Sequence, residues 1–123
     1  MQDFRRLHVW HKAHACFLAF HRAFGSPRSR SVTGFRAQTI RAAMSIPANI
    51  AEGCGKATTK EMLRFLDIAL GSSRELENHL IVARDLELVS QPQYSSLDDQ
   101  LTEVRRMLLG LVRALKRQAP RDA

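Results

Sequence analysis

Cysteine is scarce in this chain of 123 residues, which holds only Cys16 and Cys54. Two isolated thiols make neither a disulfide framework nor the paired spacing of a zinc site. Each falls on the apolar face of a predicted helix, where a free cysteine behaves as a small hydrophobic side chain. We therefore expect both to be buried thiols.

Long apolar runs are missing as well, because no stretch approaches the roughly 18 residues of a membrane-spanning helix. Residues 1–6 lead into an amphipathic pattern and lack the apolar core of a secretory signal. A chain of this length can bury one core without cross-links. We expect a single cytoplasmic domain over residues 1–123 that does not use the membrane as a partner.

Acidic residues are nearly absent from the first half of the chain. Residues 1–60 contain ten Lys/Arg but only Asp3 and Glu52, whereas residues 61–123 contain nine Lys/Arg and ten Asp/Glu. The formal net charge is +7. Such an asymmetry is typical of a surface that binds polyanions, and simple solubility of a basic chain is the competing interpretation.

Sustained period-two alternation is also absent, and four segments instead show the helical spacing of apolar residues. They cover about residues 4–24, 34–53, 59–87 and 91–118. Short connections between them predict an all-α, antiparallel up-down four-helix bundle. The apolar arc of the first segment is roughly 200° wide, about twice what a surface helix needs. We expect a contact beyond the chain's own core to cover part of it.

Capping and breaking residues set the expected helix ends. Thr33 is expected to cap the second helix, and Thr58 and Ser90 have capping-box spacing before the third and fourth helices. Pro47 removes one backbone hydrogen bond and should bend the second helix. Gly53 then helps to end it.

The second helix also carries a polar ridge within an arc of roughly 80°. Its members are Gln38, Arg41, Ser45, Asn49 and Glu52. Spacings of three and four residues let neighbours hydrogen-bond along the helix. If the ridge is buried, Glu52 must be paired, because an isolated buried carboxylate is very costly. We interpret the ridge as a structural network that fixes helix register, with a ligand or partner site as the alternative.

Neither a metal site nor a catalytic centre is predicted. His8, His11 and His14 rotate by roughly 60° from one to the next, and no second helix supplies partner ligands. Residues 53–56 lack the first glycine and the Ser/Thr of a phosphate-binding loop. Ser45 has no histidine base placed beside it. We therefore expect no cofactor and no enzymatic activity.

Basic side chains cluster on the first helix, the loop after it and the start of the second helix. They are Arg5, Arg6, Lys12, Arg22, Arg28, Arg30 and Arg36. Such cations neutralise phosphates without reading a base sequence. A second basic group decorates the last helix, at Arg105, Arg106, Arg113, Lys116, Arg117 and Arg121. A solvated helix face is the competing interpretation of both groups.

A characteristic segment covers residues 45–53, and others spread over nearly the whole chain accompany it. These are residues 7–10, Gln38, residues 41–43, residues 65–66, Ala69, residues 71–72, residues 75–76 and residues 107–109. Together they resemble the family of small four-helix-bundle proteins encoded in 23S rRNA intervening sequences. That family is related to accessory proteins of diversity-generating retroelements.

This resemblance implies a ring-like homopentamer with a basic surface or channel and no known enzymatic activity. For the retroelement relatives it implies binding to nucleic acid and to a reverse transcriptase. A ring would cover the wide apolar arc of the first helix and would repeat one basic patch, which raises avidity. Our hypothesis is a non-enzymatic homo-oligomer that binds RNA or DNA. The alternative is a protein-interaction scaffold whose charge serves solubility or a protein partner.

Overall fold

Four long α-helices dominate the structure, a computed structural model that describes residues 2–27 and 32–122. They are α1 (His8–Ala23), α3 (Thr33–Cys54), α4 (Thr59–Asp85) and α5 (Gln91–Asp122). A short 3-10 helix, η1 (Phe4–Arg6), precedes α1. These residues contain no strand, so the all-α prediction is confirmed for the described part of the chain.

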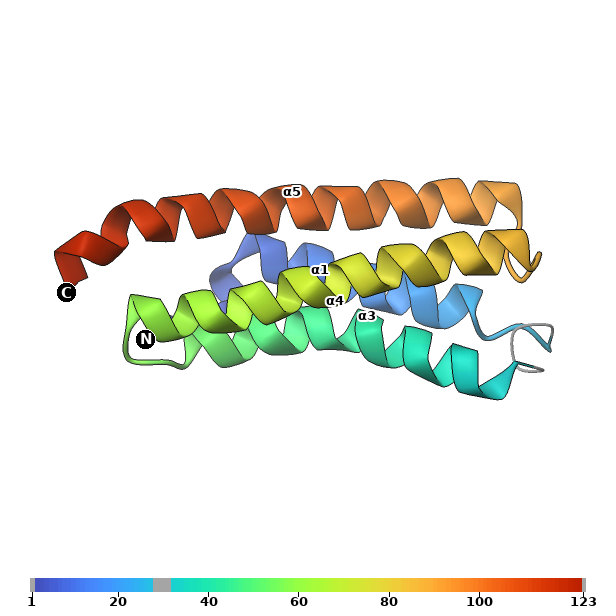
Figure 1. The fold of residues 1–123 in the computed structure, drawn as a ribbon, viewed down its shortest axis with the longest axis horizontal. Coiled ribbons are helices and arrows are strands. Elements are labelled where there is room, and N and C mark those ends of the chain that lie inside the picture. Colours follow the sequence, from blue (N-terminus) through green and yellow to red (C-terminus); the bar gives the residue numbers. More distant parts are fainter. Residues whose placement is uncertain (1, 28–31, 123) are drawn as a thin grey trace.

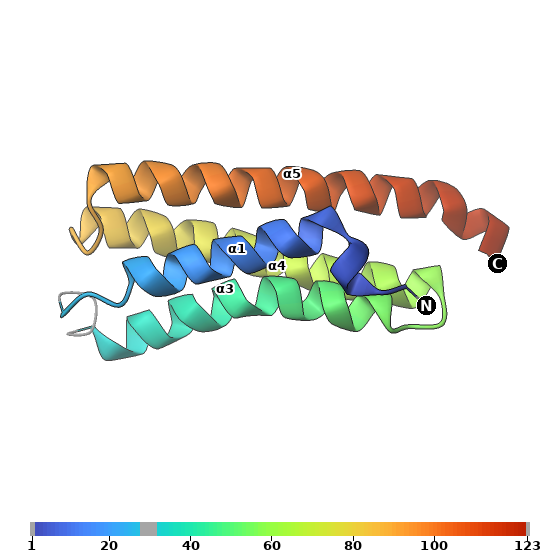
Figure 2. The same ribbon diagram turned by 180° about the vertical axis from the view of Figure 1, so that it is seen from behind.

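The helices form an up-down bundle in which successive helices run in opposite directions (Figure 1). α3 packs against α1 and α4, and α5 packs against the same two helices from the other side. Figure 2 shows this arrangement from behind, with α1 in front. The lengths are unequal, because α1 has 16 residues and α5 has 32. The C-terminal part of α5 therefore extends past the other helices (Figure 1).

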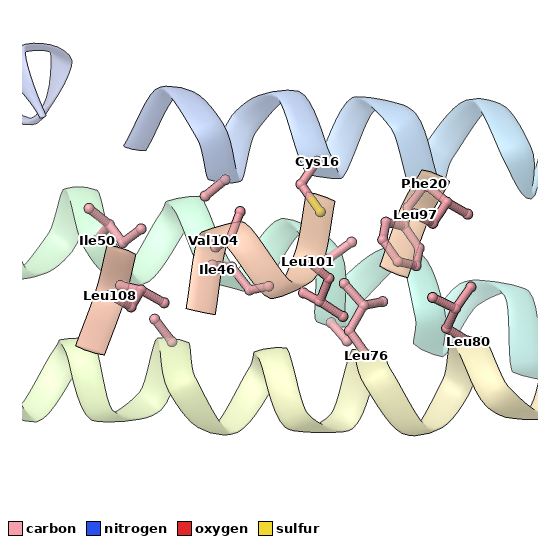
Figure 3. Close-up of a cluster of buried hydrophobic side chains, with 14 of the residues drawn as sticks. Cys16, Phe20, Ile46, Ile50, Leu76, Leu80, Leu97, Leu101, Val104 and Leu108 are labelled. Atoms are coloured by element: carbon pink, nitrogen blue, oxygen red, sulfur yellow. The ribbon is translucent and has the colours of Figure 1, made fainter. Parts of the chain in front are cut away.

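All four helices contribute side chains to one core, which fills the space between them (Figure 3). Phe20 of α1, Ile50 of α3, Leu80 of α4 and Leu108 of α5 are each fully buried. Burying a side chain of this size contributes about 1.5–3 kcal/mol. Cys16 and Cys54 are buried too, as their apolar positions predicted.

Two predicted capping boxes hold the beginnings of α4 and α5. The backbone N–H of Glu61 donates to the Thr58 hydroxyl over 3.1 Å. At α5 the bonds are reciprocal, because the Ser90 N–H donates to Gln93 Oε1 and the Gln93 N–H donates to Ser90 Oγ, over 2.8 and 3.2 Å. Each pair satisfies backbone donors that a helix start leaves open.

The first helix is shorter than predicted, because the chain breaks at Leu7. Asp3 accepts from the Arg5 N–H and starts η1, and Leu7 then takes an extended conformation with φ −86° and ψ 123°. The predicted helix over residues 4–24 is thus two elements. The expected Thr33 cap is also wrong, since α3 begins at Thr33 and Val32 occupies the N-cap position. In the first helix, the Asp3 carboxylate cap and the extended conformation of Leu7 outweighed the continuous apolar spacing of residues 4–24.

α3 runs through Pro47 without interruption, and its ribbon changes direction near the middle (Figure 1). Gly53, near its end, marks the closest approach to α4. A Cβ placed on Gly53 would lie 3.2 Å from Phe65 Cβ and 3.3 Å from the Met62 carbonyl oxygen. Gly71 in α4, in contrast, is exposed with no atom within 4 Å of such a Cβ, so no other helix approaches closely at this glycine.

A half-buried ion pair joins α4 to α5. Arg105 Nη1 lies 3.1 Å from Glu77 Oε2, and only 16% of the Arg105 side chain is exposed. The same guanidinium donates to the hydroxyl and the carbonyl of Ser73, each over 3.4 Å. Because Ser73 is itself completely buried, this contact reaches from the surface into the bundle.

No helix among the described residues has the length and apolarity that crossing a membrane requires.

Candidate functional site

Among the residues that the structure describes, the predicted basic cluster is spread along the length of α1. Arg5 and Arg6 lie at the chain's N-terminal end, whereas Arg22 lies near the other end of α1, roughly 24 Å away at 1.5 Å per residue. The exposed side chain of Lys12 lies between them. Arg28 and Arg30 lie outside the described residues. The linear proximity of these residues therefore does not carry over into space.

Two members of that cluster already have partners within the chain. Arg5 Nε lies 3.0 Å from Asp3 Oδ1, and this hydrogen bond is the main cause that lowers the pKa of Asp3. Arg36 Nε donates to the Phe24 carbonyl over 2.6 Å, so Arg36 ties α3 to the end of α1. Arg6, Lys12 and Arg22 are exposed and form no salt bridge with the carboxylates that the structure describes.

The polar ridge is only partly a structural network. Asn49 Nδ2 donates to the carbonyl and the hydroxyl of Ser45, over 2.8 and 2.9 Å. The Ser45 hydroxyl pairs with the Ser72 hydroxyl of α4 over 2.8 Å. This part of the ridge links α3 to α4 and matches the predicted role in register. Nothing in sequence spacing named Ser72 as the partner, because it comes from another helix.

The other ridge residues face outward. Gln38, Arg41 and Glu52 are exposed, and Glu52 pairs with Lys56 over 3.5 Å on the same helix side. A recess of about 190 Å³ lies between α3 and α4, lined by Gln38, Arg41, Ala42, Ser45, Ser72 and Glu75. Gln38, Arg41 and Ser45 of the ridge thus line an open polar recess instead of a buried seam.

A buried polar pair beside this recess was not predicted. The Thr39 hydroxyl lies 2.8 Å from His79 Nδ1, and the His79 ring stacks on Phe35 with centroids 5.1 Å apart. His79 Nε2 lies 3.8 Å from Glu75 Oε2. Both Thr39 and His79 occur on the inward faces of their helices. That position is the sequence signal that could have paired them.

The histidines of the first helix have individual contacts instead of a shared ligand geometry. His11 Nε2 lies 2.7 Å from the Arg5 carbonyl oxygen, and His14 stacks on Trp10 with ring centroids 4.9 Å apart. Among the described residues, no group of three or more His, Cys, Asp or Glu could hold a metal ion.

The wide apolar arc of α1 is covered more fully than the sequence suggested. Trp10, His14 and Phe17 are half-buried by the chain itself, while Leu18 and His21 stay exposed. On the neighbouring α3, 51% of Met44 is exposed. A smaller uncovered apolar area therefore remains on these two helices.

Three members of the second basic group, Arg113, Lys116 and Arg117, belong to the part of α5 near which the two ends of the chain meet. One recess of about 330 Å³ is lined by residues from both ends of the chain. They are Gln2, Cys54, Lys56, Ala57, Thr58, Thr59, Met62, Leu115 and Gln118. Leu115 and Gln118 belong to the part of α5 that carries Arg113, Lys116 and Arg117. All three of these cations are exposed. They form no salt bridge with a carboxylate in residues 2–27 or 32–118, whose side chains the structure describes.

These elements define an antiparallel four-helix bundle whose cations lie outside the core, at several separate places. A family model described as 23S rRNA-intervening sequence protein matches residues 5–110. Because the match covers most of the chain, the protein belongs to this family. The curated proteins contain no significant match. The matched region ends within α5, so Arg113, Lys116 and Arg117 lie beyond it.

Proposed function

We propose that this protein is a non-enzymatic, homo-oligomeric bundle that binds RNA or DNA through its exposed cations in the cytoplasm. The observation that carries this proposal is the excess of cations over available carboxylates. Nineteen Lys/Arg stand against twelve Asp/Glu, and exposed cations such as Arg113, Lys116 and Arg117 have no ion-pair partner among the described side chains. Phosphates are the ligands such cations bind without base readout.

Self-association is supported by the apolar side chains left uncovered on adjacent helices. Leu18 of α1 is 37% exposed and Met44 of α3 is 51% exposed, and Trp10 and Phe17 of α1 are only half-buried. The family resemblance adds a ring-like homopentamer and the role of an accessory factor for a reverse transcriptase. In such a ring each cation would be repeated, so weak phosphate contacts would combine into avidity.

Fluorescence anisotropy with labelled RNA and duplex DNA, measured from about 50 to 300 mM salt, tests nucleic-acid binding. We expect the logarithm of the binding constant to fall linearly with the logarithm of salt concentration, by about 0.7–0.9 for each phosphate neutralised. An absence of binding at low salt would contradict the proposal, as would binding that salt leaves unchanged. Multi-angle light scattering tests self-association, and a monomer at micromolar concentration would contradict it.

The second candidate is a protein-interaction scaffold without a nucleic-acid role, and the exposed apolar side chain of Met44 on α3 favours it. In that case Met44→Glu would abolish assembly or partner binding, whereas nucleic acid would not bind to the wild-type protein. The salt titration therefore separates the two candidates.

A further inference from the structure

The C-terminal part of α5 has an unusual charge pattern. Residues 104–121 contain six Lys/Arg and no Asp/Glu. Arg106, at the start of this stretch, is neutralised by a two-point contact with Glu103, over 2.6 and 3.0 Å. Beyond it, Arg113, Lys116 and Arg117 have no such partner among the side chains that the structure describes. Positive charge thus grows toward the end of the helix.

Helix geometry places the arginines of this stretch in one row. Arg113 and Arg117 fall within about 40° of each other at 100° per residue, Lys116 lies at the edge of the same solvent-facing side, and the row is about 6 Å long. The opposite side of the helix is occupied, because Leu108 is fully buried and Leu111, Val112 and Leu115 are half-buried against the bundle. The row therefore faces solvent while the apolar side of α5 anchors it.

All three cations of the row are exposed, while Leu115 on the other side of the helix still packs on the bundle. α5 extends past the ends of α1, α3 and α4 in Figures 1 and 2. Other cations lie at the same end of the molecule. Lys60 and Arg64 are in the first two turns of α4, and the Arg64 guanidinium lies 4.7 Å from the centre of the Phe65 ring, which limits its movement.

We propose that the solvent-facing row at the end of α5, formed by Arg113, Lys116 and Arg117, is the main phosphate-binding element of this protein. It rests on the proposed nucleic-acid role and moves the site away from Arg28 and Arg30. The ligand is the sugar-phosphate backbone of RNA or DNA. At 3.4 Å per nucleotide along a duplex strand, the rise of about 6 Å from Arg113 to Arg117 spans about two nucleotide steps.

A nucleic acid fits this row better than an anionic membrane does. A helix that binds a membrane surface needs a free apolar face to enter the lipid, and the apolar face of α5 already packs on the bundle. Guanidinium groups also pair with phosphate oxygens through two parallel hydrogen bonds. The row offers two guanidinium groups, those of Arg113 and Arg117. It contains no carboxylate that would attract the cations of a protein partner.

The experiment compares two triple variants that remove the same charge. In the first, Arg113→Gln, Lys116→Gln and Arg117→Gln are combined in the full chain. In the second, Lys12→Gln, Arg22→Gln and Arg41→Gln remove three exposed cations from α1 and α3. Binding to a labelled 20-nucleotide single-stranded RNA is measured across salt concentrations, and circular dichroism melting confirms that each variant is folded.

We expect the α5 triple variant to bind the RNA at least roughly tenfold more weakly at 100 mM salt, with a salt slope lower by about 2, since three phosphate contacts are lost. The α1/α3 triple variant should stay within roughly threefold of wild type. As a further check, Lys60→Gln combined with Arg64→Gln should cause a smaller loss than the α5 variant.

Several results would overturn this inference. Equal weakening by both triple variants would mean that net charge alone drives binding, and a greater loss in the α1/α3 variant would favour the first basic cluster; either leaves the proposed function in place. Wild-type protein that binds no RNA or DNA would remove both. The protein could also bind polyglutamate, or vesicles of phosphatidylserine, as tightly as RNA and with the same dependence on Arg113, Lys116 and Arg117. That result would show that the row does not select nucleic acid.

Discussion

Replacing Gly53 with alanine tests how closely α3 and α4 approach each other. In a helix this exchange normally stabilises by about 0.8–1 kcal/mol, because alanine restricts the unfolded chain and exposes less backbone. At Gly53 the new Cβ would lie 3.2 Å from Phe65 Cβ and 3.3 Å from the Met62 carbonyl oxygen. Neither atom is at the end of a flexible side chain, so relief requires the two helices to move apart.

The expected result of Gly53→Ala is a net loss of stability. Overpacking of a well-packed contact costs about 1–3 kcal/mol, and the position lies in the last turn of α3, where the helix-propensity gain is at its smallest. We therefore expect a loss of about 1–2 kcal/mol. For a chain of this size, that lowers the melting temperature by about 4–8 °C.

Gly71→Ala is the matched control, because Gly71 lies within α4 with no atom near the position of a new Cβ. It should stabilise the protein by about 0.5–1 kcal/mol. Urea unfolding of both variants at one fixed protein concentration measures the difference, since self-association would otherwise shift apparent stability. If Gly53→Ala unfolds at or above the urea midpoint of wild type, the packing argument is refuted.

Three further variants test other contacts. Arg105→Met removes the half-buried link between α4 and α5 and should cost about 1–2 kcal/mol in urea unfolding. Arg106→Met loses only a surface pair and should cost clearly less; equal costs would contradict this assignment. Glu87 has φ 59°, so Glu87→Gly should be more stable than Glu87→Ala by about 1 kcal/mol, and no difference would argue against strain there. Burial raises the pKa of the Cys16 thiol from 9.0 to about 12. The unfolded chain therefore loses this proton first, and stability should fall as pH rises from 9.0 toward 12, by up to about 1.4 kcal/mol per pH unit. If the urea midpoints of wild type and Cys16→Ala change in parallel over this pH range, the Cys16 thiol does not cause the loss of stability.

The helices and their order could be predicted from the sequence because apolar spacing reports directly which face of a helix is buried. The reciprocal bonds of Ser90 and Gln93 were equally readable, since capping depends on residues three apart. The break at Leu7 was not, because the apolar spacing runs across it and only the Asp3 side chain shows that the backbone turns. Local rules succeeded wherever the partner lies within one turn of helix.

The candidate site was harder to predict, because its partners come from different helices. Ridge spacing placed Ser45 and Asn49 together, but it could not show that Ser72 completes their network or that Arg41 stays in solvent. The grouping of Arg5 with Arg22 failed for a related reason. Each residue along a helix adds 1.5 Å to the separation, so residues close in sequence can lie far apart. The fold, in contrast, brings the two ends of the chain to the same end of the bundle.

The meeting of the two chain ends around one recess, where Gln2 and Gln118 both contribute, has a practical consequence for handling this protein. An affinity tag or fluorescent fusion at either terminus would project from the same end of the bundle, near the part of α5 that carries Arg113 and Arg117, and would crowd a ligand there. The turn between α4 and α5 lies at the opposite end of the bundle (Figure 1). A short labelling sequence inserted in that turn would leave that part of α5 free, so binding assays on tagged and untagged protein need not agree.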